Sequence, residues 1–155
     1  MVLVAHAAVG GALGASAGRR SPAWSPLWVA GWALLSHVIL DAIPHWDNLF
    51  ALGWLIADLA AALAVAAIIA RLARTPGRVF WGAFLACLPD LEHLLVGWLL
   101  PQRIFLSHLP WFPHGQAALV PGVLTQLLVV IMAIAFVARQ RAAGAPVDRP
   151  PRQGL

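Results

Sequence analysis

Residues 49–70 read LFALGWLIADLAAALAVAAIIA, a stretch in which Asp58 is the only ionisable side chain. A helix needs about 20 mostly apolar residues to cross the hydrocarbon core of a bilayer, so the stretch predicts a transmembrane helix. A carboxylate in the middle of such a helix is costly unless a partner or a metal ion stabilises it. The stretch therefore predicts a membrane protein that has a polar site in its interior.

Further apolar runs on both sides of this stretch predict four more transmembrane helices. Hydrophobic residues make up 61% of the chain and charged residues only 10%, a balance far from that of soluble domains. We expect an all-α polytopic protein, a bundle of about five transmembrane helices over residues 1–139. Residues 140–155, rich in Pro, Arg and Gly, predict a disordered cytoplasmic tail. The other four predicted spans are residues 2–18, 25–43, 79–100 and 117–138.

The arginines predict the orientation of the bundle. With five spans, nine of the ten basic residues share one side and only Arg103 lies on the other. Because short cytoplasmic loops carry the excess of positive charge, we expect the N-terminus outside and the C-terminus in the cytoplasm. The excess of arginine is explained by membrane orientation, so it does not predict a nucleic acid partner. One alternative concerns the first span, since Ala15-Ser16-Ala17 resembles a signal-peptidase site whose cleavage would remove His6, although no basic segment precedes the apolar run.

The acidic and histidine side chains fall in one layer. All six histidines, and every acid except Asp148, lie in the outer half of the predicted bundle. His37 and Asp41 are four residues apart and therefore share one helix face. Asp90 and His93, three residues apart, do the same. We expect side chains from several helices to meet in an outer-leaflet pocket.

Imidazole and carboxylate groups together are the ligands of zinc and, where more oxygen ligands are present, of iron or manganese. We therefore expect a divalent metal ion, with zinc ahead of iron or manganese. The number of these residues would fit one metal ion whose ligands are oriented by further carboxylates, and it would also fit two metal ions. Asp58 and Glu92 are candidates for a catalytic base or for such orienting groups. The candidate ligands are His6, His37, Asp41, His45, Asp90 and His93, and candidate contributors from the outer loops are Asp47, His108 and His114.

Three strings carry a resemblance to a known family. They are AHAAVG at 5–10, SHVILDAIPHWD at 36–47 and LPDLEH at 88–93. They resemble the bacterial membrane-bound metal-dependent hydrolases of the YdjM-like and YbcI-like group. Relative to better-known members of that group, the SHxxLD and PDxxH segments occur here in exchanged order. The His-Arg-Gly-x-Thr-His string of better-known members is absent, and FLSHLPWFPHGQ at 105–116 stands in its place. The resemblance implies metal binding in the bacterial cytoplasmic membrane.

Together these features predict a membrane-embedded hydrolase that acts from the outer face on a lipid or lipid-linked ester or phosphoester. Its partners would be membrane lipids and a lipid-like substrate. Two other classes are a small transporter or proton or metal relay, and a non-catalytic membrane assembly factor. A relay needs polar groups across the whole membrane, whereas mainly Ala, Val, Ile and Leu lie below Asp58 and Asp90. The lack of polar residues in the inner half of the predicted bundle favours a site that is confined to the outer half.

Overall fold

The computed structural model describes residues 3–17, 25–46, 52–92, 96 and 99–143. This part of the chain is helical and has no β-strand, as expected for an all-α protein. Its elements are α1 (Leu3–Ala17), α2 (Ser25–Ala42), α3 (Leu52–Ala73), α4 (Pro76–Cys87), η1 (Leu88–Asp90), η2 (Leu106–His108) and α6 (Leu119–Ala143), where η denotes a short 3₁₀ turn.

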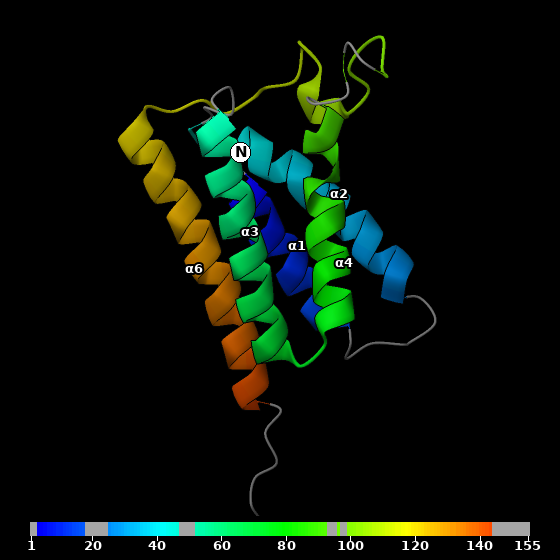
Figure 1. Cartoon of the computed structure of the whole chain (residues 1–155), viewed down its shortest axis with the longest axis vertical. Helices are drawn as coiled ribbons and strands as arrows, with labels where there is room; N and C mark the ends of the chain where they lie inside the picture. Colours follow the sequence, from blue (N-terminus) through cyan, green and yellow to red (C-terminus); the bar gives the residue numbers. More distant parts are fainter. Residues whose placement is uncertain (1–2, 18–24, 47–51, 93–95, 97–98, 144–155) are drawn as a thin grey trace, which may run out of the picture.

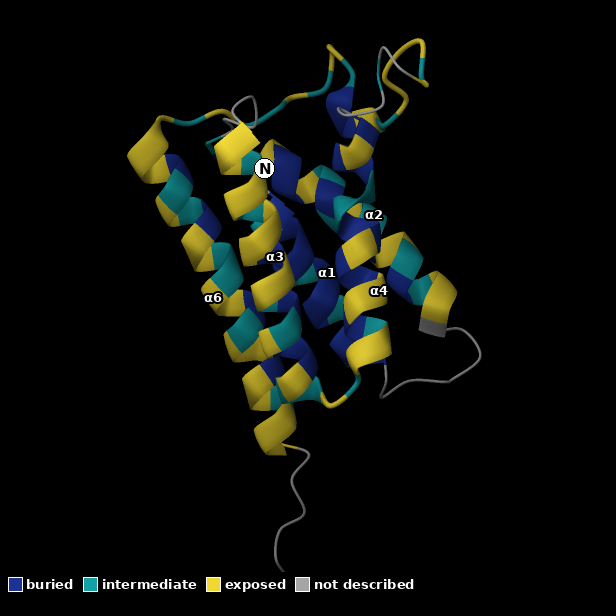
Figure 2. Ribbon diagram, in the orientation of Figure 1, coloured by how far each residue is buried: buried dark blue, intermediate teal, exposed yellow. Residues whose placement is uncertain are grey.

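Helix α1 is the centre of the bundle. It contacts α2, α3, α4 and α6, and most of its residues are buried. Figure 2 shows α1 in dark blue behind α3 and α4. Its glycines explain the close packing, because a Cβ on Gly10 would overlap the backbone of Gly82 in α4, and a Cβ on Gly14 would overlap that of Arg78. Small residues that let helix backbones approach are typical of membrane bundles.

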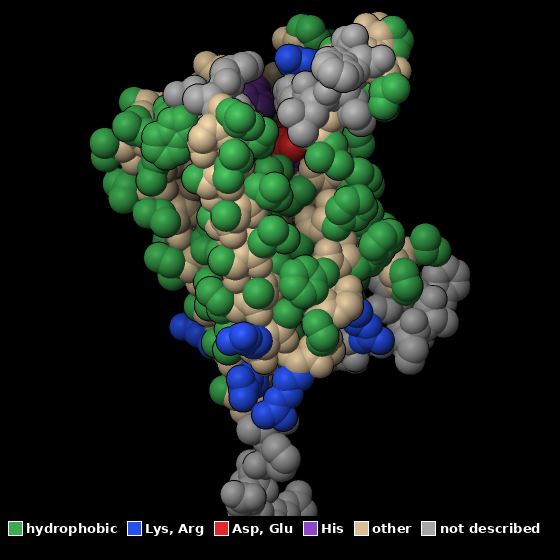
Figure 3. All heavy atoms as spheres, viewed as in Figure 1, with side chains coloured by type: hydrophobic (Ala, Val, Ile, Leu, Met, Phe, Trp, Pro, Cys, Tyr) green, Lys and Arg blue, Asp and Glu red, His purple; other side chains and the backbone are tan. Residues whose placement is uncertain are grey.

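Two of the helices, α3 and α6, are long and apolar enough to cross a membrane. Helix α1 and residues 26–42 are apolar but shorter. Large apolar side chains cover the outward faces of α3 and α6; Leu52 is 71% exposed and Met132 is 62% exposed. Most of the visible basic side chains gather at the end of the molecule where α3 and α6 finish, and acidic and histidine side chains are visible near the opposite end (Figures 1 and 3). Length and composition thus support two spanning helices, and the further spans stay a prediction.

The predicted helix over residues 79–100 is wrong in its second half. Helix α4 ends at Cys87, the turn η1 follows, and residues 91–92 are helical again, whereas residue 96 and residues 99–100 are not. Pro89 explains the change, because proline has no N–H to donate and its ring clashes with the preceding turn. As a result Asp90 lies in a 3₁₀ turn that interrupts the helical segment. The boundary of the predicted tail also moves, since α6 continues to Ala143; residues 144–155 lie outside the described part.

The contact between α1 and α4 can be tested with Gly82→Ala. A Cβ at this position would overlap the carbonyl oxygen of Gly10, so we expect the substitution to destabilise the protein by about 1–3 kcal/mol, as overpacking does. Gly31→Ala in α2 is the matched control, because no atom lies within 4 Å of its added Cβ. Thermal unfolding in detergent measures both variants. Equal midpoints for the two would contradict the close packing.

Candidate metal centre

Five buried side chains from four elements meet at one end of the bundle. Helix α2 supplies two of them one turn apart, and α1, η1 and η2 each supply one. The set contains three imidazoles and two carboxylates, and each of the five residues is at most 8% exposed. We call this set the central cluster; it consists of His6, His37, Asp41, Asp90 and His108.

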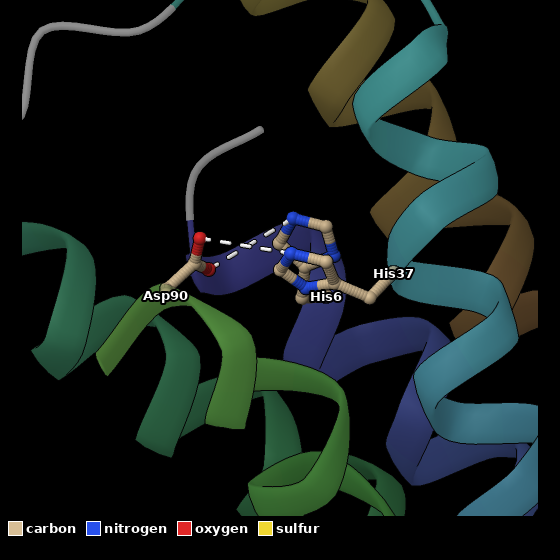
Figure 4. A group of neighbouring side chains, drawn as sticks. All are labelled: His6, His37 and Asp90. Carbon is tan, nitrogen blue, oxygen red and sulfur yellow. Dashed lines mark ion pairs between the residues drawn. The ribbon is translucent and has the colours of Figure 1, made fainter. Parts of the chain in front are cut away.

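Asp41 lies among the three imidazoles. Its Oδ1 is 3.3 Å from Nε2 of His6, and its Oδ2 is 3.0 Å from Nε2 of His37 and 3.7 Å from Nε2 of His108. The second carboxylate, Asp90, faces the same three nitrogens at 3.8–3.9 Å. Figure 4 shows Asp90 directed at the stacked rings of His6 and His37, whose centroids are 4.0 Å apart. Three Nε2 atoms therefore converge on two carboxylates.

The other ring nitrogen of two of these histidines is held by an acceptor. Nδ1 of His37 lies 2.7 Å from the carbonyl oxygen of Ala86, and Nδ1 of His108 lies 2.9 Å from Oε2 of Glu92. A nitrogen that faces an oxygen acceptor must carry the proton, so we assign the Nδ1–H tautomer to both rings. Each Nε2 then presents a lone pair toward the carboxylates. A histidine oriented in this way is the usual form of a metal ligand.

Glu92 positions His108. Besides the imidazole, its carboxylate accepts hydrogen bonds from the backbone N–H groups of Ile104 and Phe105. Burial lowers the pKa of His108, and the hydrogen bond that His108 donates to Glu92, which by itself raises the pKa, does not reverse this shift. His108 is therefore neutral near pH 7, the state in which an imidazole binds a metal.

The Nε2 atoms of His6 and His37 have no hydrogen bond within the described part of the chain, although both are buried. Oxygens of Asp41 lie 3.3 Å from Nε2 of His6 and 3.0 Å from Nε2 of His37, so each imidazole faces a carboxylate at close range. Lone pairs of nitrogen and carboxylate oxygen repel one another unless a cation lies between them. A proton joins two atoms, whereas a metal ion accepts ligands from several directions, so the convergence of five side chains fits a metal better.

The distances within the cluster also fit a metal ion. The ligand atoms of His6, His37 and Asp90 lie within 4.8 Å of one another, and so do those of His37, Asp41 and His108. Three imidazoles with carboxylate oxygens match the ligands of zinc, and of iron or manganese when both carboxylates bind. The buried histidines and aspartates of the central cluster could thus hold a metal ion.

The structure places the remaining predicted residues differently. His45 and His114 lie together beside Asp41, at the edge of the central cluster. Among the residues that the structure describes, Asp58 belongs to none of the groups of adjacent candidate ligands. Its carboxylate accepts hydrogen bonds from the N–H groups of Leu3 at 2.7 Å and Val4 at 3.1 Å. These are first-turn donors of α1 without intrahelical partners, so Asp58 stabilises the start of that helix.

Asp47 and His93 lie outside the described residues.

The sequence did not identify His108 as a central residue, because its position depends on the fold of a long connection between helices. The one signal was the position of FLSHLPWFPHGQ, which stands where the resembling family carries a histidine string. No family model, curated protein or solved structure matches the chain. The family resemblance therefore rests on the motifs alone, and function has to be argued from the site itself.

The role of Glu92 can be tested by Glu92→Gln. The amide keeps the size of the side chain but removes the charge that holds the His108 tautomer, and loss of such a partner weakens metal binding about 10- to 100-fold. We expect this loss in zinc titrations of the metal-free protein. Ser107→Ala is the control, because the buried hydroxyl of Ser107 has no hydrogen-bond partner in the described structure. Unchanged affinity in Glu92→Gln would contradict the positioning role.

Proposed function

We propose that this protein is a membrane-embedded, metal-dependent hydrolase that cleaves an ester or phosphoester of a lipid or lipid-linked substrate. The single observation that carries the proposal is the convergence of three imidazole Nε2 atoms on two buried carboxylates. Buried ionisable clusters of this kind are costly for a fold, so they mark functional sites more often than structural ones.

The proposal places the protein in the bacterial cytoplasmic membrane as a multi-pass bundle. Support comes from the apolar outward faces of α3 and α6 and from the arginines at one end of the molecule. Arg71 and Arg141 lie in the last turns of these two helices. If this end is cytoplasmic, the central cluster lies nearer the outer face. A site held within the bundle suits a substrate that reaches it from the lipid.

The central cluster would hold the metal, which supplies Lewis acidity for the scissile ester or phosphoester and for the attacking water. Within the cluster Asp90 is the most exposed carboxylate and also faces all three imidazoles. Asp90 would thus be a metal ligand that the attacking water could also reach, and the same carboxylate could accept the proton of that water. Glu92 and the carbonyl of Ala86 hold His108 and His37 in the orientation that the site needs.

The packing beneath the cluster favours a hydrolase over a relay. A buried apolar layer that includes Ala8, Ala12, Ile69, Val79 and Val137 fills the bundle between the cluster and the basic end. A proton or metal relay needs polar groups that continue through such a layer. An assembly factor in which the cluster only packs helices is also less favoured, because packing alone leaves buried imidazole nitrogens without hydrogen bonds.

Metal analysis of the purified full-length protein tests the metal centre. We expect at least one equivalent of a divalent metal, and its loss in His37→Ala and in Asp90→Ala, since each removes a ligand from the cluster. Gln140→Ala is the matched control, because it removes a polar contact with Ser16 at the basic end of the bundle. The absence of metal from the unmodified protein, or full retention in both ligand variants, would refute the proposal.

Hydrolysis is tested with the protein in detergent and in vesicles of phosphatidylethanolamine and phosphatidylglycerol. The probes are p-nitrophenyl phosphate, p-nitrophenyl butyrate and the vesicle lipids themselves. We expect cleavage of at least one of these that a chelator abolishes and that Asp90→Ala reduces about 100-fold or more, since about 100-fold is the lower end of the range for a lost acid–base group. Metal or proton flux across the vesicles without any hydrolysis would support the relay instead.

A further inference from the structure

A second set of candidate ligands adjoins the central cluster and shares one residue with it. His45 is 1% exposed and His114 is half-buried, and their rings meet edge to face with centroids 4.8 Å apart. A ring nitrogen of each and a carboxylate oxygen of Asp41 all lie within 4.8 Å of one another. We call Asp41, His45 and His114 the peripheral group.

Backbone hydrogen bonds fix the two segments that form this group. The N–H of Gly115 donates to the carbonyl of Asp41 at 2.8 Å, and the N–H of Ala117 donates to the carbonyl of His45 at 2.8 Å. Gly115 is required for this approach, because a Cβ there would overlap the carbonyl of Ile43. His114, which directly precedes Gly115, is therefore held beside Asp41 by the fold and not by a chance side-chain contact.

His45 is oriented in the same way as His37 and His108. Its Nδ1 lies 2.6 Å from the carbonyl oxygen of Ile43, so Nδ1 carries the proton and Nε2 presents the lone pair. A backbone carbonyl fixes His37 by the same means. The repeated use of a carbonyl to direct Nε2 indicates that both imidazoles are positioned to bind a cation.

Asp41 connects the two sets. One oxygen of its carboxylate faces His6 and the other faces His37, and the peripheral group uses the same carboxylate. A carboxylate can bind two cations with its two oxygens, and hydrolytic sites with two metals hold them about 3.5–4 Å apart. Two histidines with one aspartate are also a known ligand set for a catalytic cation with an open position.

We propose that the peripheral group binds a second divalent cation and that Asp41 bridges the two metal sites. This inference rests on the proposed function and narrows its substrate to phosphoesters, because paired cations stabilise the attacking and leaving oxygens of an in-line displacement at phosphorus. In the reaction, water forms a new P–O bond, the P–O bond to the alcohol breaks, and the proton of the water passes to the alcohol. No electron transfer occurs.

Cation stoichiometry of the full-length protein tests this inference without recourse to activity. Metal-free protein in detergent is titrated with Zn²⁺ by calorimetry, and with Mn²⁺ by electron paramagnetic resonance, which detects a magnetically coupled pair. We expect two cations per chain and a coupled Mn²⁺ signal. His114→Ala is the main variant because His114 is only half-buried; it should bind one cation and lose the coupled signal. Gln116→Ala is the control, since its exposed side chain lies in the same segment.

The outcomes separate this inference from the proposed function. Two cations in the unmodified protein and in Gln116→Ala, with one in His114→Ala, support the second site. One cation in all three proteins overturns the second site and leaves the metal at the central cluster intact. No cation in any of them overturns both. Cleavage of p-nitrophenyl butyrate but not of p-nitrophenyl phosphate would overturn the phosphoester assignment.

Discussion

The contact on which the rest of the structure depends is the approach of three imidazole nitrogens to the carboxylates of Asp41 and Asp90. Ionisable groups buried in this way lose their hydration, and they are tolerated only when charge and hydrogen bonding are balanced locally. The fold around them serves this need. Gly10 and Gly82 bring α1 against α4, so that His6 and Asp90 can meet at the same level of the bundle.

Helix ends explain why the site forms where it does. The last carbonyls of a helix have no intrahelical donor, and in this protein they orient histidines instead. The carbonyl of Ala86, in the last turn of α4, accepts from His37, and the carbonyl of Ile43, just after α2, accepts from His45. Pro89 and Pro44 each follow within three residues of these carbonyls. The prolines thus end the helices and leave acceptors beside the ligands.

The parts of the site that depend on local spacing were predictable from the sequence. His37 and Asp41 are one turn apart on α2, and helical geometry alone places them together. The convergence of His6 and Asp90 on this pair followed from their common depth. His108 could not be placed, because no periodicity describes the connection from Pro101 to Gly115.

Two other predictions show how local chemistry alters a span. The fourth apolar run was expected to be one helix over residues 79–100, but Pro89 ends α4 early. Asp58 was singled out because a carboxylate within a span needs a partner. The structure provides that partner at the N-terminus of α1, through the amides of Leu3 and Val4. A buried charge in a membrane helix can therefore satisfy a helix end as well as bind a metal. The number of spanning helices stays a prediction beyond α3 and α6.

The most direct test of the central claim is anomalous X-ray diffraction from crystals of the metal-loaded protein, recorded above and below the absorption edge of the metal. The account predicts an anomalous peak among His6, His37, Asp41, Asp90 and His108, with ligand distances of about 2.0–2.2 Å if the metal is zinc. Crystals that contain bound metal elsewhere but show no peak among these five side chains would contradict it.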